Sequence, residues 1–477
     1  MTEKKEKTKQ RLINDLSKEM AESNLAVFIG AGLSIPAGYA SWNKLLAPIA
    51  EALDLDIEKE LDLVTLAQYH YNDQQSRGKI NQLLIDEFSK EAKATENHEI
   101  LARLPISTFW TTNYDKLIED TLCKNSKIVD IKYTNNHLVI TKQKRDAIVY
   151  KMHGDIDHPD KAILIKDDYE AYHLKMQPFL NALSGDLTSK TFLFLGFSFT
   201  DPNLDYILSR VRLAYNENQR PHYCLSKKVS MSDCKDDKAE YEYKSRKQEL
   251  FIQDLKRFGI NTVLIDDYDE ITEILSKLEQ KYKHKTVFIS GAAHEYKKWG
   301  KEASEKFVYE LSKKIAAHDF KIVSGFGLGV GSSVIAGVLE HVYMSGNRLN
   351  DEQLILRPFP QSEEGKSLWT EYREDMLSHA GIAIFIFGNK LENGEIVPSS
   401  GMRDEFNIAR KKGLVLLPIG ATGDISKDLW LDAKTDIQNR FGKNAEIMEL
   451  YEKLGDEDLT TDELTQVIID LLKHFQQ

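Results

Sequence analysis

Two glycine-rich segments, each placed directly after a hydrophobic stretch, constrain the fold of this chain more than any other feature. The first, Gly30-Ala31-Gly32-Leu33-Ser34, follows the run LAVFI, and the second, GFGLGVG at residues 325–331, follows FKIVS. Small residues at the end of a strand allow backbone N–H groups to approach a phosphate without clashes from Cβ atoms. Two such turns in a chain of 477 residues predict two Rossmann-like domains.

The hydrophobic pattern in the first half alternates between strand-like and helix-like segments, which predicts a parallel sheet covered by helices. Helix-like periodicity occupies residues 42–53, 63–71 and 80–88, and the charged segment 226–248 is expected to be a solvated helix or a surface excursion. The strand-like runs are residues 25–29, 108–111, 147–152, 191–195 and 262–265.

A periodic helix at residues 270–282 precedes a second series of the same kind, so we place a domain boundary after residue 283. The expected architecture is α/β, with two Rossmann-like parallel-sheet domains at residues 1–283 and 284–477. The strand-like runs of the second domain are residues 286–290, 320–324, 353–357, 382–387 and 414–419.

Composition and charge narrow the range of partners. The chain has 63 Lys and Arg against 75 Asp and Glu, and this net charge of −12 gives no general attraction to nucleic acid. The charged N-terminal residues lack the apolar core of a signal peptide, and glycines and Pro36 interrupt the longest uncharged stretch, residues 25–42. We therefore expect a cytoplasmic protein that binds neither nucleic acid nor membrane.

The cysteine pattern argues against a metal site. Cys123, Cys224 and Cys234 form no CxxC pair and are too few for a four-cysteine zinc site. An odd number of cysteines without pairs is typical of a reducing compartment. We expect no bound metal.

Polar residues follow two further strands of the first domain. Asn113 lies in TTNYD after the second strand-like run, and His153 lies in MHGD after the third. The ends of parallel strands converge on one crevice, where Asn113 can orient a ribose hydroxyl or a water and His153 can accept a proton near neutral pH. Structural alternatives remain open: a plain tight turn for GAG, a helix N-cap for Asn113, and a strand-end histidine with satisfied hydrogen bonds for His153.

The motifs GAGLS, TTNYD, MHGD and GFSFTDPNL together resemble the sirtuin-like NAD-consuming domains of bacterial defence effectors. The resemblance implies that the GAG turn binds the pyrophosphate of NAD+, which is the substrate, and that Asn113 and His153 are the catalytic pair. The residues implied to bind NAD+ are Gly30, Ala31, Gly32, Ser34, Asp115, Gly196 and Ser198.

The chain departs from protein-deacylating sirtuins in two places. Those enzymes also carry two zinc-binding cysteine pairs and a GIPDFR-like continuation after the GAG turn, whereas this chain has no cysteine pair and continues IPAGYASW. Without the zinc module that helps to form an acyl-lysine cleft, water is the expected acceptor. We therefore expect an NAD+ glycohydrolase that releases nicotinamide and ADP-ribose. An NAD-dependent protein deacylase and a non-catalytic nucleotide-binding scaffold remain the alternatives.

The second glycine-rich segment has the pattern of an anion-binding nest at a helix N-terminus, and a shorter turn at Ser290-Gly291 can border the same crevice. Arg373 can bind a phosphate with its two-pronged guanidinium, Lys390 can supply a point charge, and Glu405 can accept hydrogen bonds from ribose hydroxyls. A structural glycine turn and solvated surface charges are the alternative interpretations.

This half resembles a SLOG nucleotide-sensing domain, on the segments GFGLGVGS, LILRPFPQ, IFIFGNK, DEFNIA and LLPIGATG. The order of a sirtuin-like domain followed by SLOG resembles the effectors of the Thoeris anti-phage defence system. That resemblance implies abortive infection, a homo-oligomer (a tetramer or a higher assembly), and activation by a cyclic ADP-ribose isomer that a TIR-domain protein makes. Hydrolysis of a nucleotide by this domain is disfavoured, because the chain has no PGGxGTxxE-like run. The implied activator-binding residues are Ser290, Gly291, Gly325, Phe326, Gly327, Arg373, Lys390 and Glu405.

Overall fold

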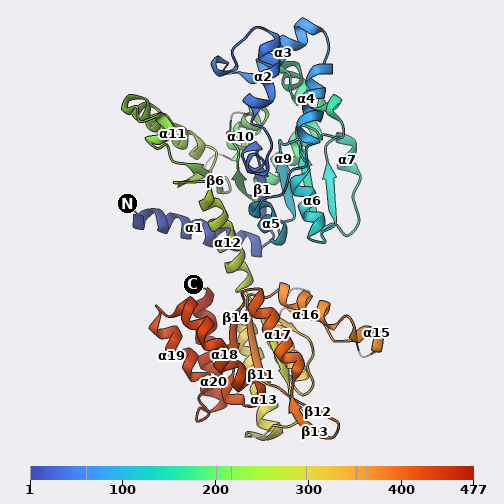
Figure 1. Ribbon diagram of the computed structural model, residues 1–477, viewed down its shortest axis with the longest axis vertical. Coiled ribbons are helices and arrows are strands. Elements are labelled where there is room, and N and C mark those ends of the chain that lie inside the picture. The colour runs from blue at the N-terminus through green and yellow to red at the C-terminus, as the bar shows by residue number, and fades with distance from the viewer. Residues whose placement is uncertain are drawn as a thin grey trace. The chain divides into compact units, whose positions relative to one another are not determined.

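The computed structural model describes residues 2–60, 62–199, 201–215, 218–296, 298–346, 348–349, 353–360 and 362–476. Thr200 of the GFSFTDPNL motif and Gln361 of LILRPFPQ lie outside the described residues. The chain divides into two compact units, residues 1–279 and 280–477 (Figure 1). The division falls within helix α12 (Asp269–Lys283), whose last residue is the boundary expected from the sequence.

The described residues of the first unit form a seven-stranded parallel sheet with the order β3-β4-β2-β1-β5-β6-β7. Strand β1 lies between β2 and β5, so the strand order reverses at β1 and β5, where open α/β sheets bind ligands. The strands are β1 (Leu25–Ile29), β2 (Thr108–Thr111), β3 (Val129–Lys132), β4 (Ala147–Lys151), β5 (Thr191–Leu195), β6 (His222–Lys227) and β7 (Ile260–Ile265).

Strands β3 and β6 were not predicted, because their sequences, VDIK and HYCLSK, contain charged and polar residues. The structure satisfies those groups within the sheet. Lys132 pairs with Asp130 at 2.8 Å, and the Nδ1 atom of His222 accepts a hydrogen bond from the backbone N–H of Phe192 at 3.1 Å. Specific partners, within the same strand for Lys132 and on a neighbouring strand for His222, thus allow polar sequences to form strands.

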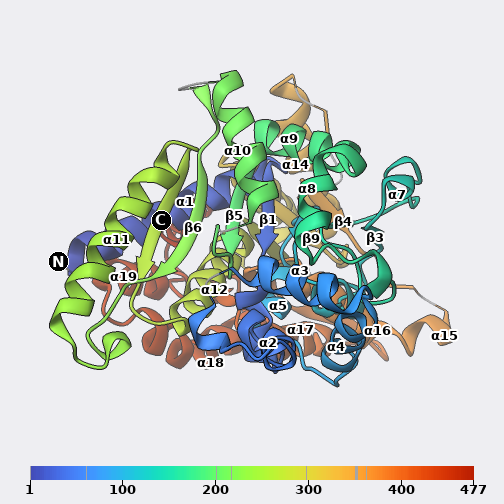
Figure 2. The same cartoon turned by 90° about the horizontal axis from the view of Figure 1, so that it is seen from above.

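Helices cover both faces of this sheet. Side chains of α9 and α10 pack with Phe28 and Phe194 in one core, and Figure 2 shows α8, α9 and α10 on the same side of β1 and β5. Helices α2 to α4 form a smaller cluster around Tyr114 and Leu164. Helix α11, from the segment expected to be solvated, is mostly exposed. The helices are α1 (Thr2–Ala21), α2 (Trp42–Ala52), α3 (Leu63–Gln74), α4 (Gly78–Phe88), α5 (Glu96–Arg103), α6 (Leu117–Lys124), α7 (Asn135–Val139), α8 (Lys166–Lys175), α9 (Gln177–Ser189), α10 (Pro202–Tyr215) and α11 (Lys238–Lys256).

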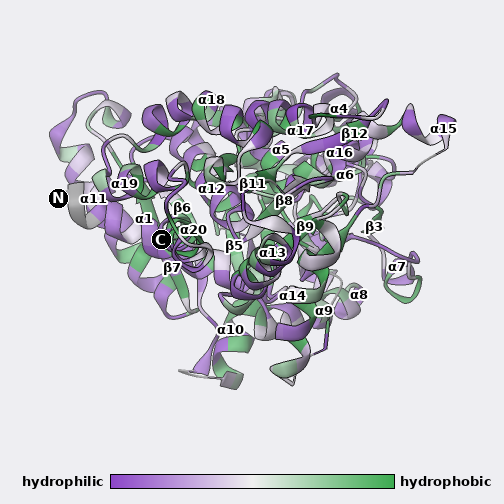
Figure 3. Ribbon diagram, turned by 90° about the horizontal axis from the view of Figure 1, so that it is seen from below, coloured by the Kyte–Doolittle hydropathy of each residue, from purple (hydrophilic) through white to green (hydrophobic). Residues whose placement is uncertain are grey.

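The second unit contains a parallel sheet with the order β10-β9-β8-β11-β14 among its described residues, and the strand order reverses at β8 and β11. All five strands agree with the predicted runs, and the hydrophobic residues of β11 stand out in Figure 3. The strands are β8 (Thr286–Ala292), β9 (Lys321–Ser324), β10 (Leu354–Leu356), β11 (Ile382–Phe387) and β14 (Val415–Pro418).

An antiparallel hairpin, β12 (Asn389–Glu392) and β13 (Glu395–Pro398), was not predicted from the sequence.

Within the described ranges, every helix of the chain is too short or too polar to cross a lipid bilayer. The helices of the second unit are α13 (Gly300–Ala317), α14 (Gly331–Met344), α15 (Glu363–Lys366), α16 (Trp369–Ser378), α17 (Ser400–Lys411), α18 (Asp424–Phe441), α19 (Ala445–Lys453) and α20 (Thr461–Gln476).

Candidate functional site

The GAG turn after β1 packs directly on the turn after β5. The backbone N–H of Gly32 donates to the carbonyl oxygen of Gly196 at 2.9 Å, and a Cβ atom on Gly30 would lie 2.4 Å from the same oxygen. Gly196 has φ +62°, and a Cβ atom there would lie 2.3 Å from the backbone nitrogen of Leu33. These glycines are therefore required for packing at the reversal of the strand order. Ala31 is partly exposed and Ser198 is exposed on the two turns.

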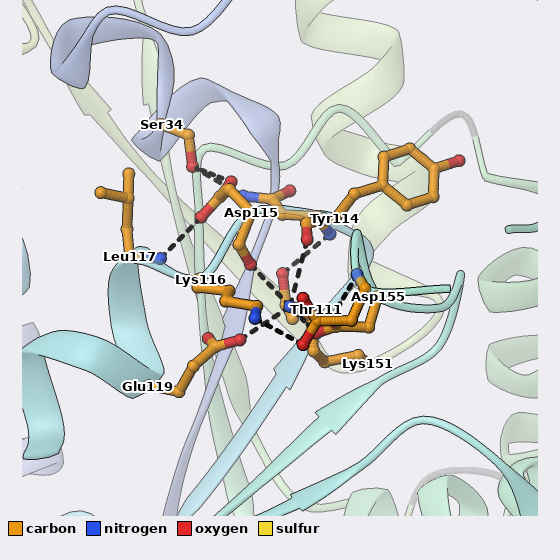
Figure 4. Close-up of polar contacts among 11 residues, drawn as sticks. Ser34, Thr111, Tyr114, Asp115, Lys116, Leu117, Glu119, Lys151 and Asp155 are labelled. Carbon is orange, nitrogen blue, oxygen red and sulfur yellow. Dashed lines mark hydrogen bonds and ion pairs between the residues drawn. The ribbon is translucent and has the colours of Figure 1, made fainter. Parts of the chain in front are cut away.

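Asn113 lies in the loop after β2 and is 8% exposed. Its Nδ2 atom donates to the carbonyl oxygen of Gly30 at 3.2 Å and to Oγ of Ser34 at 2.9 Å. Ser34 Oγ in turn donates to Oδ2 of Asp115 at 2.8 Å, and Figure 4 shows these two side chains pointing toward one another. The N-cap of α6 is Lys116, so the N-cap interpretation of Asn113 is wrong.

His153 follows β4 and is 2% exposed. Its Nε2 atom lies 3.0 Å from Oδ2 of Asp201, but neither ring nitrogen is aligned for a hydrogen bond to a described residue. The alternative of a strand-end histidine with satisfied hydrogen bonds is therefore wrong. The Oδ1 atom of Asn113 is likewise buried without a hydrogen-bond partner among the described residues. Buried polar atoms of this kind are normally paired, so their presence at one sheet edge indicates a place for a polar ligand.

Asp201 was not among the predicted site residues, although its motif DPNL was part of the resemblance. Burial raises the pKa of its carboxyl, but the charge of His153, 3.0 Å away, and hydrogen bonds from the backbone N–H groups of Leu204 and Asn203 together lower it below its ordinary value. The carboxylate therefore stays ionised beside His153 while it caps α10. The sequence offered one sign of this role: Asp201 stands directly before Pro202, the first residue of α10, which is a position typical of an N-cap.

The glycine-rich loop of the second unit also packs against the strand next to it. A Cβ atom on Gly327 would lie 1.9 Å from the carbonyl oxygen of Gly291, and one on Gly325 would lie 2.8 Å from the Phe359 ring. Phe326 has φ +58° and is 48% exposed, so the loop holds an aromatic ring toward solvent. The alternating glycines thus serve close packing, which leaves Phe326 available for contact with a ligand.

Three of the predicted activator-binding residues form one buried cluster. Ser290 Oγ donates to Oε2 of Glu405 at 2.5 Å, and Arg373 Nε lies 3.7 Å from Oε1 of Glu405. Arg373 is 8% exposed and its guanidinium lies 5.2 Å from the centre of the Phe359 ring. Burial raises the pKa of Glu405 to about 7, although the Ser290 hydrogen bond and the charge of Arg373 oppose this rise. Arg373 and Glu405 are therefore not solvated surface charges.

Lys390 stands apart from this cluster, on hairpin strand β12. Its ammonium lies 3.1 Å from a carboxylate oxygen of Glu392 and donates to Oγ of Ser400 at 3.4 Å. It is partly exposed, so the interpretation as a surface charge suits Lys390 better than it suits Arg373.

A hollow of about 530 Å³ beside the glycine-rich loop is lined by Ala293 and Leu328 among others, and none of the predicted activator-binding residues lines it.

Residues 107–251 match the SIR2-like domain family, and residues 270–475 match the Sir2- and TIR-associating SLOG family. The chain is 54% identical over 463 residues to NAD(+) hydrolase ThsA of Bacillus cereus (strain MSX-D12), with 97% of each chain covered. The chain belongs to the ThsA family. The NAD(+) hydrolase ThsA of Acinetobacter baumannii (strain 532279) is 47% identical over 97% of this chain and 98% of its own length. Defense-associated sirtuin 2 of Bacillus subtilis is 26% identical over 42% of this chain and 20% of its own length.

These comparisons confirm the sirtuin-like domain, the SLOG domain and their order along the chain. The assignments of individual residues to NAD+ and to an activator stay predictions. Cys123, Cys224 and Cys234 are free thiols. Within the part of the chain that the structure describes, no group of three or more His, Cys, Asp and Glu side chains is arranged to hold a metal ion.

Proposed function

We propose that the first unit hydrolyses the nicotinamide–ribose bond of NAD+ and that a cyclic ADP-ribose isomer bound to the second unit switches this reaction on. Four relatives at 43 to 54% identity over nearly the whole chain are NAD(+) hydrolases, so this chain is an NAD+ hydrolase. The observation that carries the residue assignment is the pair of buried side chains, Asn113 and His153, with unpaired polar atoms at the reversal of the strand order.

The proposed reaction resembles glycoside cleavage, in which the bond to the leaving group breaks through an oxocarbenium-like transition state. Asn113 is held by Gly30 and Ser34, and its free Oδ1 accepts a hydrogen bond from a ribose hydroxyl or the attacking water. His153 accepts a proton from that hydroxyl or water. The ionised carboxylate of Asp201, 3.0 Å away, stabilises the imidazolium that forms. The turns that carry Gly30 and Gly196 hold the pyrophosphate and orient the ribose.

Activation by a cyclic ADP-ribose isomer is supported by the chemistry of the cluster in the second unit. Arg373 is buried, its Nε atom has no hydrogen-bond partner among the described residues, and it lies against two aromatic rings. A guanidinium in this state suits a phosphate group, and Glu405 beside it suits a ribose hydroxyl. Phe326 offers an exposed ring on which a base can stack.

The biological part of the proposal is an anti-phage abortive-infection effector that destroys NAD+ once a TIR-domain protein has made the activator. The name of the SLOG family, Sir2- and TIR-associating, supports the link to a TIR partner, and the defence-associated relative supports the role. A cytoplasmic location and a homo-oligomer, a tetramer or a higher assembly, belong to the same proposal and rest on the resemblance to Thoeris effectors.

A nicotinamide-release assay on the full chain tests the catalytic assignment. Wild type is compared with His153→Ala and Asn113→Ala, without activator and with cyclic ADP-ribose or its glycosidic-linkage isomers. Each variant should lose activity by about 10²- to 10⁴-fold, whereas His173→Ala, at an exposed histidine of the same unit, should not. A folded His153→Ala protein that retains more than about a tenth of the wild-type rate would show that the base is another residue.

The same assay separates hydrolysis from deacylation. An acetyl-lysine peptide added as a competing acceptor should leave nicotinamide release unchanged and should stay acetylated. Formation of the free lysine peptide at the rate of nicotinamide release would instead assign the chain to the deacylases. A wild-type rate that no cyclic ADP-ribose isomer changes would contradict the proposed activation.

A further inference from the structure

Lys151 is the last residue of β4, and its side chain is completely buried. Four oxygen atoms surround its ammonium, as Figure 4 shows. The distances from Nζ are 2.6 Å to the carbonyl oxygen of Asp115, 3.2 Å to that of Tyr114, 2.7 Å to Oε1 of Glu119 and 2.6 Å to Oδ2 of Asp155. A buried lysine with this many close acceptors is fixed in one position.

The four acceptors lie on the two segments that follow the predicted catalytic residues Asn113 and His153 along the chain. Tyr114 and Asp115 directly follow Asn113, and Glu119 lies in the first turn of the helix that this loop enters. Asp155 belongs to the loop that begins at His153. The ammonium therefore links the segment after Asn113 to the loop after His153 through hydrogen bonds and ion pairs. It makes no contact with the side chain of Asn113 or of His153.

The charges in this cluster favour a protonated lysine. Burial lowers the pKa of Lys151, but the carboxylates of Glu119 and Asp155 more than offset this effect, so its pKa is raised. Burial raises the pKa of Glu119 to about 7 against the opposing charge and hydrogen bond of Lys151, and the charge of Asp115 adds to the rise. An ammonium has three protons to donate, each of which needs an acceptor when water is excluded.

We infer that Lys151 is a positioning residue for NAD+ hydrolysis, because its ammonium fixes the Asn113 loop relative to the His153 loop. This inference rests on the proposed function. Lys151 acts through the placement of the two catalytic side chains and not through contact with the substrate. Displacing one catalytic group by about 1 Å can cost about 100-fold in rate, whereas substrate held by the glycine turns depends less on this placement.

Lys151→Met removes the ammonium and keeps a side chain of similar length. We expect kcat for nicotinamide release to fall by about 100-fold, with a KM for NAD+ that changes by less than about threefold. The isosteric change Glu119→Gln keeps the lysine and an amide oxygen to accept its hydrogen bond but removes one negative charge beside the ammonium, and should lower kcat by about 5- to 10-fold. All proteins are full-length and are compared under the activator condition that gives wild type its highest rate.

Lys132→Met is the matched control. Lys132 is also a buried strand lysine, paired with Asp130 at 2.8 Å, but it lies on the outer strand β3, which carries none of the predicted site residues. This variant measures what the loss of a buried lysine ion pair does to the fold alone. It should keep kcat within about threefold of wild type, even where its melting temperature falls as far as that of Lys151→Met.

Two results would overturn the inference: a folded Lys151→Met with the kcat of Lys132→Met, or a loss that appears only in KM. If Lys151→Met does not fold, the isosteric double variant Glu119→Gln with Asp155→Asn decides, and a kcat within about threefold of wild type in that variant overturns it. If the wild-type chain releases nicotinamide and the Lys151 and Glu119 variants do so at the same rate, the inference about Lys151 fails and the proposed function stands. If the wild-type chain releases no nicotinamide, the inference and the proposed function both fail.

Discussion

Replacing Glu405 by glutamine should change how the stability of the second unit depends on pH. Burial raises the pKa of Glu405 from 4.5 to about 7, against the opposing effects of Ser290 and Arg373. The folded unit therefore holds a proton that the unfolded chain releases. This contribution to stability is fully present below about pH 4.5 and is lost as the pH rises through about 7.

The magnitude follows from the two pKa values. A carboxyl group with a pKa of 4.5 when unfolded and about 7 when folded changes the free energy of unfolding by roughly 3 kcal/mol in total. Most of this loss, roughly 2 to 3 kcal/mol, falls between pH 5 and pH 8. Glutamine has nearly the same shape and still accepts the hydrogen bond from Ser290, but it does not titrate. From pH 5 to pH 8 the wild type should therefore lose roughly 2 to 3 kcal/mol more than Glu405→Gln.

The assay is urea unfolding of both full-length proteins at intervals between pH 5 and pH 8. Taking the difference between the two curves removes every other titrating group, including Glu119, whose pKa burial also raises to about 7. Glu374→Gln, at an exposed position of the same unit, is the matched control and should follow the wild type at every pH. Parallel curves for wild type and Glu405→Gln would refute the argument, as would a difference that shrinks with rising pH.

Three further predictions concern the glycine turn, the partner of the proposed catalytic histidine and the proposed sensor. Gly196→Ala places a methyl group 2.3 Å from a backbone nitrogen at φ +62°, so it should destabilise the first unit by at least about 2 kcal/mol in chemical unfolding; Gly185→Ala, in the open, should be neutral or stabilising by up to about 1 kcal/mol. Asp201→Asn keeps an oxygen to cap α10 but loses the charge, and should lower kcat about 10-fold or more with the fold intact; a change under about threefold would show that this carboxylate does not assist the histidine. Arg373→Ala should raise the half-activating concentration of the cyclic ADP-ribose isomer by about 10- to 150-fold, whereas Arg403→Ala, on the surface of α17, should not; coincident activation curves for both variants and wild type would contradict the sensor assignment.

The sequence alone determined the architecture and placed the candidate site residues at the ends of its strands. The central strands are buried on both faces of their sheets, so LAVFI, TFLFL and IAIFIF appear as continuous hydrophobic runs with glycine or polar residues directly after them. These local patterns placed the two glycine turns, Asn113 and His153 at strand ends. Strands with charged residues, such as β3, could not be predicted, because their charged groups are satisfied by one another and by the segment that folds back beside them, as Lys132 pairs with Asp130 and Asp130 with Arg145.

Only the tertiary structure decided the partners and the electrostatics of these residues. The sequence contains Asp201 and His153 in separate motifs, and packing of the β5–α10 connection against the end of β4 brings them to 3.0 Å. Lys151 lies within a hydrophobic strand pattern, and four converging oxygens give its ammonium a role. Glu405 becomes a carboxyl that titrates near neutrality because the folded unit removes water from it. Desolvation and long-range pairing depend on which segments cover a side chain, and the spacing of residues along the chain does not determine that.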